Sequence, residues 1–518
     1  MLSQTYSATV IGIDAYAVEV EVNATGRGEM DMVSIVGLAD QAIRESRDRI
    51  HSAMLASGIR PAKGSTVVNL APGDLRKEGA GFDLAIALGM LAATGQIPRE
   101  ELSSCMVLGE LALDGSIRPV RGALPIAAMA ADNPQIKALL VPEANAEESA
   151  LITQNKKPVY PVKNLLQACD FFRGVKPEPK QSSLHDYLAT RANIYQPDFA
   201  EVKGQLAARR AMEIAAAGGH NSLMIGPPGT GKSMIAKRLA GILPPMTLAE
   251  TLETSRIHSV LGMLSSGEPL LNNRPFRAPH HTVSDVALIG GGKNPRPGEI
   301  SLAHNGVLFL DELPEFKRNV LEVLRQPLEN GDITVSRASG SCVFPARFML
   351  VAAMNPCPCG RGSIELGCSC KLDEKKRYQK KISGPLLDRI DLHVPVLNLT
   401  EDELLSAPSG ESSSVIRQRV IAARQIQQKR FARLEYVMHC NAQMGPRELA
   451  MFCAIAPDSA LLLRQAIQKF HLSPRAHDRI LKVARTIADL AGSSSINADH
   501  LLEAITYRTI DRQEWSLQ

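Results

Sequence analysis

A glycine-rich stretch in the middle of the chain has the residue types and spacing of a phosphate-binding loop. It reads Gly226-Pro227-Pro228-Gly229-Thr230-Gly231-Lys232-Ser233 and fits G-x-x-x-x-G-K-[ST]. An apolar run precedes it and a helical pattern over 234–243 follows it. Backbone amides of such a loop point at the β-phosphate, while the lysine reaches the β- and γ-phosphates and the hydroxyl binds Mg²⁺. We therefore expect an ATP site in which Lys232 contacts phosphate and Ser233 holds Mg²⁺.

An ATP site with a phosphate loop also needs carboxylates that bind Mg²⁺ and activate water, and an acidic pair further along the chain has these residue types. The apolar run 306–310 reads as a buried strand and ends in Asp311-Glu312. We expect Asp311 to hold Mg²⁺, directly or through water, and Glu312 to orient and deprotonate the attacking water. Alone, such a pair is as often a solvated strand end, and the upstream loop is what favours the catalytic interpretation.

Three further side chains suit the same site. Asn355 ends the next apolar run, where its amide is placed to contact the γ-phosphate or the attacking water. Arg389 suits an arginine finger, which stabilises negative charge on a transferred phosphoryl group; the alternative is an ion pair with Asp388 or Asp391. Arg475, at the start of a helical pattern, is placed to touch phosphates from there.

Four of the nine cysteines stand within fourteen residues of the chain, directly after Asn355. Cys357, Cys359, Cys368 and Cys370 have the spacing C-x-C, eight residues, C-x-C. Four thiolates suit a tetrahedral zinc site, although the spacing departs from the usual C-x₂₋₄-C. Free thiols are the alternative, and a disulfide is disfavoured in the cytoplasm. We predict a structural zinc site without a catalytic role.

The composition limits the class of protein. At 518 residues the chain is too long for one core, and its charged fraction of 22% is ordinary for a globular protein. The net charge is +4, so a surface for nucleic acid must be a local patch. No apolar run is long enough to cross a bilayer and the first residues lack a signal-peptide pattern, so we expect a cytoplasmic location without a membrane partner.

The motifs in this order resemble the AAA+ ATPases: Walker A, Walker B, sensor asparagine, arginine finger and a helical lid with a sensor arginine. The stretches 275–282 and 289–298 resemble the magnesium-chelatase branch, in which a helix-2 insert and a pre-sensor hairpin project toward a central pore. By this resemblance the insert spans about Val286 to Glu299 and the hairpin about Ile333 to Phe348. The adjacent histidines His280 and His281 diverge on any regular element, so we do not expect a metal pair there.

The whole chain resembles a narrower group, the ComM (YifB-type) family, whose members carry an N-terminal Lon-protease-like domain. The stretches 77–88 and 108–120 carry this part of the resemblance. Active Lon-type proteases have a serine in the first glycine-rich turn and a lysine after the second segment. Here the turn reads Gly79-Ala80-Gly81-Phe82, and no lysine follows in 121–126, so no peptidase chemistry is expected.

The expected fold class is therefore α/β: a parallel sheet flanked by helices, with a helical lid and an N-terminal α+β domain of the Lon-protease (S5) type. The expected boundaries are an N-terminal domain over 1–173, a linker over 174–196, an ATPase core over 197–397 with the cysteine insert at 357–370, and a lid over 398–518.

The family resemblance implies a ring-shaped hexamer that hydrolyses ATP and moves single-stranded or branched DNA through its pore. Family members promote branch migration during uptake and recombination of transforming DNA, with recombination or uptake proteins as further partners. Position in the pore makes Lys293, Arg296 and Arg337 candidate DNA contacts, and Lys375, Lys376 and Arg377 form a basic run after the cysteines. Solvated surface charge is an equal alternative for each of them.

Two other functions stay open from the sequence. One is a magnesium-chelatase ATPase subunit, although such subunits normally lack a Lon-type domain and paired cysteines. The other is an ATP-switched binding or regulatory module, because a motor and a switch share the same hydrolytic residues.

Overall fold

The structure is a computed structural model of the chain. It describes residues 1–25, 32–61, 64–154, 156–184, 187, 197–264, 268–292, 295–337, 340–362, 367–399, 410–470 and 472–513. The chain divides into two compact units, one of Met1–Asn193 with Leu248–Asn272, the other of Ile194–Thr247 with Asn273–Gln518. We describe each unit by itself. In the described part of the chain, no helix is long and apolar enough to cross a membrane.

A seven-stranded mixed sheet lies at the centre of the first unit, in the order β3-β4-β2-β1-β5-β8-β9. The β1–β2 and β2–β4 pairs are antiparallel and the other pairs are parallel. The strands are β1 (Leu2–Ile11), β2 (Asp14–Ala24), β3 (Met32–Val36), β4 (Ser65–Ala71), β5 (Cys105–Val107), β8 (Ala138–Pro142) and β9 (Val159–Val162), with a short hairpin of β6 (Glu110–Leu111) and β7 (Ile117–Arg118).

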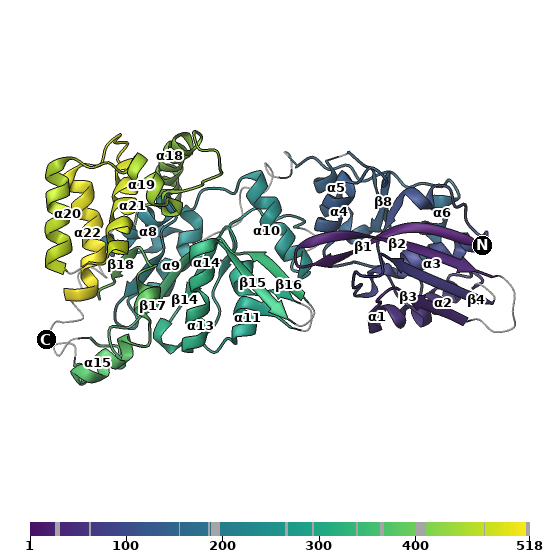
Figure 1. The fold of residues 1–518 in the computed structure, drawn as a ribbon, viewed down its shortest axis with the longest axis horizontal. Coiled ribbons are helices and arrows are strands. Elements are labelled where there is room, and N and C mark those ends of the chain that lie inside the picture. Colours follow the sequence, from purple (N-terminus) through teal and green to yellow (C-terminus); the bar gives the residue numbers. More distant parts are fainter. Residues whose placement is uncertain are drawn as a thin grey trace. The chain divides into compact units, whose positions relative to one another are not determined.

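Helices cover this sheet from both faces (Figure 1). One apolar cluster joins α2, α3 and α6 to the inward side chains of β2 and β4, and a second joins α4 and α5 to β1, β5 and β8. Every residue of α3 is buried, as expected of a helix that is apolar all round after its first residue, Asp83. The helices are α1 (Gln41–Arg44), α2 (Ser46–Ala56), α3 (Asp83–Ala93), α4 (Ala123–Asp132), α5 (Glu143–Thr153) and α6 (Leu165–Phe172), with 3₁₀ turns η1 (Ala80–Phe82) and η2 (Leu102–Ser104).

One helix of the first unit comes from a distant part of the sequence. Helix α10 (Leu248–Val260) follows the phosphate-loop helix in the chain, within the predicted ATPase core, yet it groups with the N-terminal residues. The carbonyl of Ser259 accepts from the N–H of Gly122 at 3.0 Å. The Tyr187 hydroxyl donates to the carbonyl of Leu270 at 2.9 Å. The first unit is therefore built from two separate stretches of the chain.

A five-stranded parallel sheet forms the centre of the second unit, in the order β11-β14-β17-β10-β18. The three apolar runs that the sequence marks as buried strands are β10, β14 and β17, and all their residues are buried. Because the strands are parallel, the residues that follow them gather at one edge. The strands are β10 (Ser222–Ile225), β11 (Phe276–Arg277), β14 (Val307–Leu310), β17 (Met349–Met354) and β18 (Leu392–Pro395).

Helices flank this sheet, and a helical region follows it, so the predicted α/β core and C-terminal helices are confirmed (Figure 1). The core helices are α8 (Leu206–Gly218), α9 (Lys232–Ile242), α11 (Asp285–Ile289), α12 (Glu299–Leu302), α13 (Arg318–Val323), α14 (Arg325–Asn330), α15 (Leu372–Gln379) and α16 (Gly384–Leu387), with η3 (Phe199–Glu201) and η4 (Leu313–Glu315). The C-terminal helices are α18 (Ser413–Phe431), α19 (Pro446–Phe452), α20 (Pro457–Phe470), α21 (Pro474–Leu490) and α22 (Ala498–Gln513), with η5 (Asn441–Gln443).

Two small antiparallel pairs match the predicted insert and hairpin. The insert contains α11, then β12 (Gly290–Gly291) paired with β13 (Arg296–Pro297). The hairpin consists of β15 (Asp332–Arg337) and β16 (Gly340–Pro345), and its turn lies outside the described residues.

Candidate nucleotide site and four-cysteine centre

The glycine-rich loop connects β10 to α9, as the sequence predicts. Gly229 and Gly231 have φ angles of 82° and 88°, in the left-handed region that glycine adopts without strain. A Cβ on Gly229 would meet nothing within 4 Å, so the loop surface there is open to a phosphate. A Cβ on Gly226 would lie 2.0 Å from the carbonyl oxygen of Val396, so the loop can pack against the end of β18 only with glycine at this position.

The ammonium group of Lys232 lies at the start of the phosphate loop. Its Nζ donates to the carbonyls of Gly226 at 2.7 Å and Pro227 at 2.8 Å, and lies 3.3 Å from Oδ1 of Asn355. Burial lowers the pKa of Lys232, while the carboxylate of Asp311 opposes this change. The cation therefore stands between the loop and the strand end that carries the predicted sensor asparagine.

The acidic pair lies at the same sheet edge, because Gly226, Asp311 and Asn355 directly follow three neighbouring parallel strands. The Ser233 hydroxyl donates to Oδ2 of Asp311 at 2.6 Å, and Oδ1 of Asp311 accepts from the backbone N–H of Glu312 at 2.9 Å. A hydroxyl beside a carboxylate is a donor set that suits Mg²⁺, which prefers oxygen ligands. The residues therefore fit the predicted metal and nucleotide.

Glu312 contacts a histidine that the sequence does not link to it. Nδ1 of His281 lies 3.2 Å from Oε2 of Glu312, and the His281 ring packs edge-on against Phe316 at 6.4 Å between centroids. The neighbouring His280 bonds Thr282 instead, through its own Nδ1 at 2.9 Å. The two histidines have separate hydrogen-bond partners, but their rings lie 4.1 Å apart between centroids, so the side chains do not diverge as the sequence argument assumes. The Walker-type motifs give no signal for this contact.

Arg389 is held inside its own chain. Its guanidinium is 4% exposed, pairs with Glu329 and donates to the carbonyl of Pro385 at 2.6 Å. The acidic partner is thus Glu329, sixty residues away, and not Asp388 or Asp391, which the sequence suggests.

Both candidate arginines lie toward the opposite sheet edge from the phosphate loop. Arg389 stands just before β18, and Ser222 at the start of β10 lies opposite the first residue of β18. Asp391 lies at the same end and pairs with Arg479 of α21. Burial alone would raise the pKa of Asp391, but Arg479 and a buried histidine hold it well below its usual range. Arg475 is exposed one helical turn before Arg479.

The four cysteines converge as predicted. Their sulfur atoms all lie within 4.8 Å of one another. The Sγ of Cys357 is 3.3 Å from that of Cys359 and 3.7 Å from that of Cys368, and Cys359 is 3.6 Å from Cys368. Zinc–sulfur bonds of about 2.3 Å place tetrahedral sulfurs about 3.8 Å apart, whereas a disulfide needs about 2.05 Å. The geometry therefore suits zinc with Cys357, Cys359, Cys368 and Cys370 as ligands.

Backbone donors contact two of the four sulfurs, although burial raises the pKa of the Cys357 thiol. The N–H of Gly362 donates to the sulfur of Cys357 at 3.2 Å. The N–H of Arg361 lowers the pKa of Cys359 to about 6. Such hydrogen bonds to ligand atoms are typical around metal ions.

The cysteine loop packs directly on the nucleotide site. Gly360 has a φ of 83°, and a Cβ there would lie 2.7 Å from Cγ of Pro228 in the phosphate loop. The buried ring of Tyr378, on α15, places its hydroxyl against the backbone N–H of Asn355. The four-cysteine loop, the phosphate loop at Pro228 and the strand end at Asn355 therefore share one packed region.

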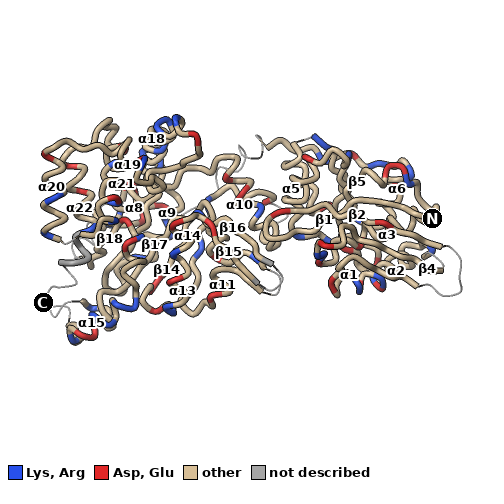
Figure 2. Tube along the Cα trace, in the orientation of Figure 1, with Lys and Arg blue, Asp and Glu red and all other residues tan. Residues whose placement is uncertain are grey.

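The predicted DNA contacts fall into different environments. Arg296, Lys376 and Arg377 are exposed, and Figure 2 shows lysine or arginine along α15. Lys375 donates from Nζ to the carbonyl of Gly362 at 2.7 Å and so holds the cysteine loop. Lys293 and the side chain of Arg337 lie outside the described residues.

Comparison with known proteins places three matches along the chain. Residues 198–404 match the family model of magnesium chelatase subunit ChlI, residues 410–508 match the ChlI C-terminal model, and residues 18–145 match a further model of subunit ChlI of Mg-chelatase. The Competence protein ComM of Haemophilus influenzae is 42% identical over 519 residues, which cover 99% of this chain and 98% of that protein. The uncharacterized protein YifB of Escherichia coli is 42% identical over 518 residues, with the same two coverages.

The similarity to a magnesium-chelatase subunit itself is more limited. The magnesium-chelatase 38 kDa subunit of Rhodobacter capsulatus is 27% identical over 176 residues, which cover 30% of this chain and 50% of that protein.

Proposed function

Because the chain belongs to the ComM/YifB family of magnesium-chelatase-like ATPases, with an N-terminal ChlI domain, we propose that it is an ATP-driven motor that acts on branched DNA. The observation that carries the proposal is the gathering of Lys232, Ser233, Asp311 and Asn355 at one sheet edge, with Glu312 beside them. Because the H. influenzae relative is a competence protein, we place this activity in competence, during uptake and recombination of transforming DNA.

Each residue has a distinct role in hydrolysis. The loop amides and Lys232 bind the β- and γ-phosphates, and Ser233 with Asp311 would hold Mg²⁺, whose charge offsets that of the phosphate oxygens. Glu312 accepts a proton from the attacking water, and Asn355 orients that water or the γ-phosphate.

The position of Arg389 supports an oligomer. Strand β10 has four residues and so separates the two sheet edges by about 13 Å. An arginine buried at the amino edge and bound to Glu329 does not reach the phosphate loop of its own chain. We propose that Arg389, once released from Glu329, completes the site of a neighbouring copy together with the exposed Arg475 near it. A closed ring, which we take to be a hexamer, gives every site such a neighbour.

We propose that His281 controls Glu312. The histidine contacts the catalytic carboxylate, and in the chain it follows β11 and precedes the insert that carries the candidate DNA contact Arg296. While His281 binds the Glu312 carboxylate, that carboxylate does not face the attacking water that it deprotonates in hydrolysis. His281→Ala should therefore raise ATP turnover in the absence of DNA and reduce the stimulation by DNA. His280→Ala is the comparison: it keeps the groups of the His281–Glu312 contact but removes the bond to Thr282 and the ring contact between the two histidines, whose centroids are 4.1 Å apart.

We propose that the four-cysteine centre holds one structural zinc per chain and that Lys376 and Arg377 beside it contact DNA phosphates. Phosphate contacts give affinity that falls steeply with salt and carries no base specificity. Elemental analysis that finds well under one zinc per chain, with all four thiols free, would contradict the zinc site.

The N-terminal unit is proposed to have a Lon-protease-like fold without peptidase activity. Ala80 occupies the turn where a nucleophile would stand. The buried Asp83 that follows is bound by Arg49 at 2.8 and 3.0 Å and serves the fold.

The alternative of a magnesium-chelatase subunit rests on the chelatase family models. The full-length similarity to ComM, compared with 30% of the chain for the R. capsulatus subunit, makes it the weaker candidate. An ATP-switched module differs only in the absence of movement along DNA.

ATP hydrolysis measured with and without branched DNA, over a range of salt concentrations, separates the three functions. We expect strong stimulation by DNA that declines with salt, and loss of hydrolysis in Lys232→Ala. A rate of ATP hydrolysis that is the same with and without DNA at every salt concentration would exclude the motor. Stimulation of hydrolysis by DNA without movement of the DNA strands would indicate the ATP-switched module.

A further inference from the structure

Strand β3 lies at one end of the seven-stranded sheet of the first unit, and its outer edge is unpaired among the described residues. Strand β3 pairs only with β4, in parallel, and the N–H of Met32 donates to the carbonyl of Gly64 at 3.3 Å. Because ladder bonds alternate along a strand, Val33 and Ile35 direct their N–H and C=O groups to the outer edge. No strand that the structure describes pairs with them there. An unpaired edge is a template for a further strand.

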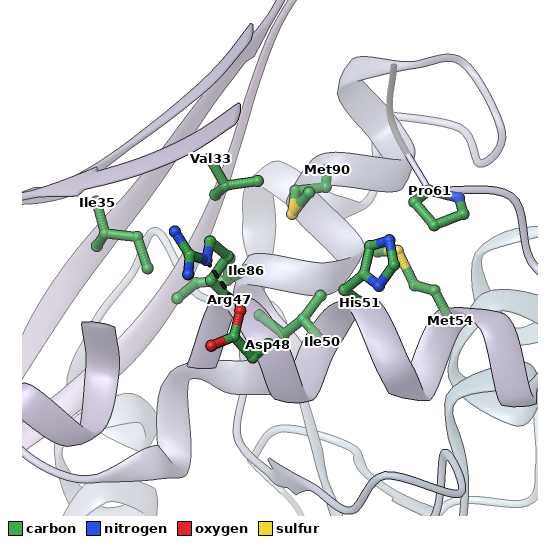
Figure 3. A pocket seen from close by; sticks show the side chains of 10 residues that line it. All are labelled: Val33, Ile35, Arg47, Asp48, Ile50, His51, Met54, Pro61, Ile86 and Met90. Carbon is green, nitrogen blue, oxygen red and sulfur yellow. Dashed lines mark hydrogen bonds and ion pairs between the residues drawn. The ribbon is translucent and has the colours of Figure 1, made fainter. Parts of the chain in front are cut away.

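A cavity of about 300 Å³ lies beneath the same strand. Figure 3 shows side chains of β3, α2 and α3 pointing into it. Most of the lining is aliphatic or thioether, and a few polar groups stand at one side: Val33, Ile35, Ile50, Met54, Ile86, Met90 and Pro61, with Arg47, Asp48 and His51. This is the low end of the volume of ligand sites, enough for one large apolar side chain.

The opposite face of this edge is also apolar and exposed. Met32, Val36 and, on the neighbouring strand, Val67 are 66%, 46% and 42% exposed. Val67 lies opposite Ser34 in the register, between the other two. Single exposed apolar residues are common, but a group beside a free edge and a cavity indicates a binding surface.

We propose that the groove between β3 and α2 binds an extended segment of a partner protein as an added strand. The segment has alternating apolar side chains: one row enters the cavity and the other covers Met32, Val36 and Val67. Its backbone pairs with Val33 and Ile35.

The alternation of these features favours a peptide over a small molecule. The residues that line the cavity, Val33 and Ile35, are the same ones whose backbone groups face outward, and this is the arrangement by which sheet edges bind peptides. A compact ligand would fill the cavity and leave the edge unpaired. At the rim, Arg47 and Asp48 pair with each other at 3.0 Å, so the groove has no net demand for a charged ligand.

The test uses the full-length chain and a pool of seven-residue peptides. The pool has Val, Ile, Leu or Phe at the odd positions and Thr, Ser or Lys at the even ones, with a second pool of the same composition in block order. We expect selection of members of the alternating pool only. The selected peptide should protect the amides of Val33 and Ile35 from hydrogen exchange. Selection from both pools alike, or from neither, would overturn the proposal.

Two variants and one control locate the binding. Ile35→Pro removes the backbone N–H of residue 35, which points to the outer edge and does not bond to β4. Val33→Lys places a charge in the cavity. Each should weaken binding of the selected peptide at least tenfold. Because Val33 and Ile35 pack against the core, a lower melting temperature is expected, and binding is measured where circular dichroism shows that each variant is folded. Leu55→Ser, on an exposed position of α2 outside the cavity, should leave the affinity within twofold. Unchanged binding in both groove variants would overturn the proposal. Protection of the Val33 and Ile35 amides in the free protein would also overturn it. So would a loss of self-association in Val33→Lys, because a second copy of the chain would then be the occupant of the groove.

Discussion

The contact between the cysteine loop and the phosphate loop can be tested with a single methyl group. Gly360→Ala adds a Cβ that would lie 2.7 Å from Cγ and 2.8 Å from Cδ of Pro228. Both distances are far below an ordinary carbon–carbon contact, which is about 3.5–4.0 Å. The proline ring belongs to the phosphate loop and has no free rotation, so the loop must move.

Two terms make up the cost of this substitution. A left-handed φ of 83° costs alanine about 1–2 kcal/mol. Overpacking against a rigid neighbour adds about 1–3 kcal/mol. Gly492→Ala is the matched control, because Gly492 has a φ of 68° and a Cβ there would meet nothing within 4 Å. The control carries the first term only, and the difference between the variants isolates the contact with Pro228.

The assay is the affinity for ATP, measured on both variants together with their zinc content. If the displaced loop loses about 1.4 kcal/mol of nucleotide binding, the Kd rises about tenfold in Gly360→Ala. We expect Gly492→Ala to stay within twofold of wild type and both to retain zinc. An unchanged Kd in Gly360→Ala, with zinc retained, would refute the view that the cysteine loop positions the phosphate loop.

Three further outcomes follow from the geometry. Glu312→Gln should bind ATP as wild type does but lose at least a hundredfold in single-turnover hydrolysis, since it removes the proton acceptor; full turnover would show that another group is the base. Mixed with wild type, Arg389→Ala subunits should reduce activity more than dilution does, whereas Glu329→Gln, which changes only the partner within the chain, should not; a purely dilutive loss would count against action between copies. Burial raises the pKa of Glu148 to about 7, compared with about 4.3 in an unfolded chain. The folded state then binds the extra proton, so stability should fall by roughly 3 kcal/mol as the pH rises from about 4 to 7. Hydrogen exchange in α5, measured between about pH 4 and 7, should show this loss of stability in wild type but not in Glu148→Gln. The same pH dependence in both proteins would contradict the prediction.

Local patterns in the sequence predict the strand–loop–helix order of the nucleotide site. The motif around Lys232 is recognised from its residue types and spacing alone. The apolar runs before Asp311 and Asn355 are the observed β14 and β17. At the helical end, the Ser473 side chain caps α21 by accepting from the N–H of Ala476 at 3.2 Å, and a serine directly before a helical pattern is a local signal of this kind. These features depend on residues that are neighbours in the chain.

Contacts between distant parts of the chain escape such reasoning. The bond of His281 to Glu312 depends on β11 lying beside β14, and the partner of Arg389 comes from α14, sixty residues earlier. Lys375 belongs to a basic run that suggests a DNA contact, yet its ammonium group bonds the cysteine loop. The grouping of α10 with the first unit likewise follows from tertiary packing, because its sequence has no distinct apolar face and most of its buried residues are polar.

The most direct test of the motor is strand exchange on a synthetic four-way DNA junction, followed in real time with purified wild-type protein and ATP. We predict that the junction is resolved into duplexes only with ATP, and that Lys232→Ala binds the junction but leaves it intact. A wild-type protein that hydrolyses ATP, binds the junction and never moves its strands would contradict the account.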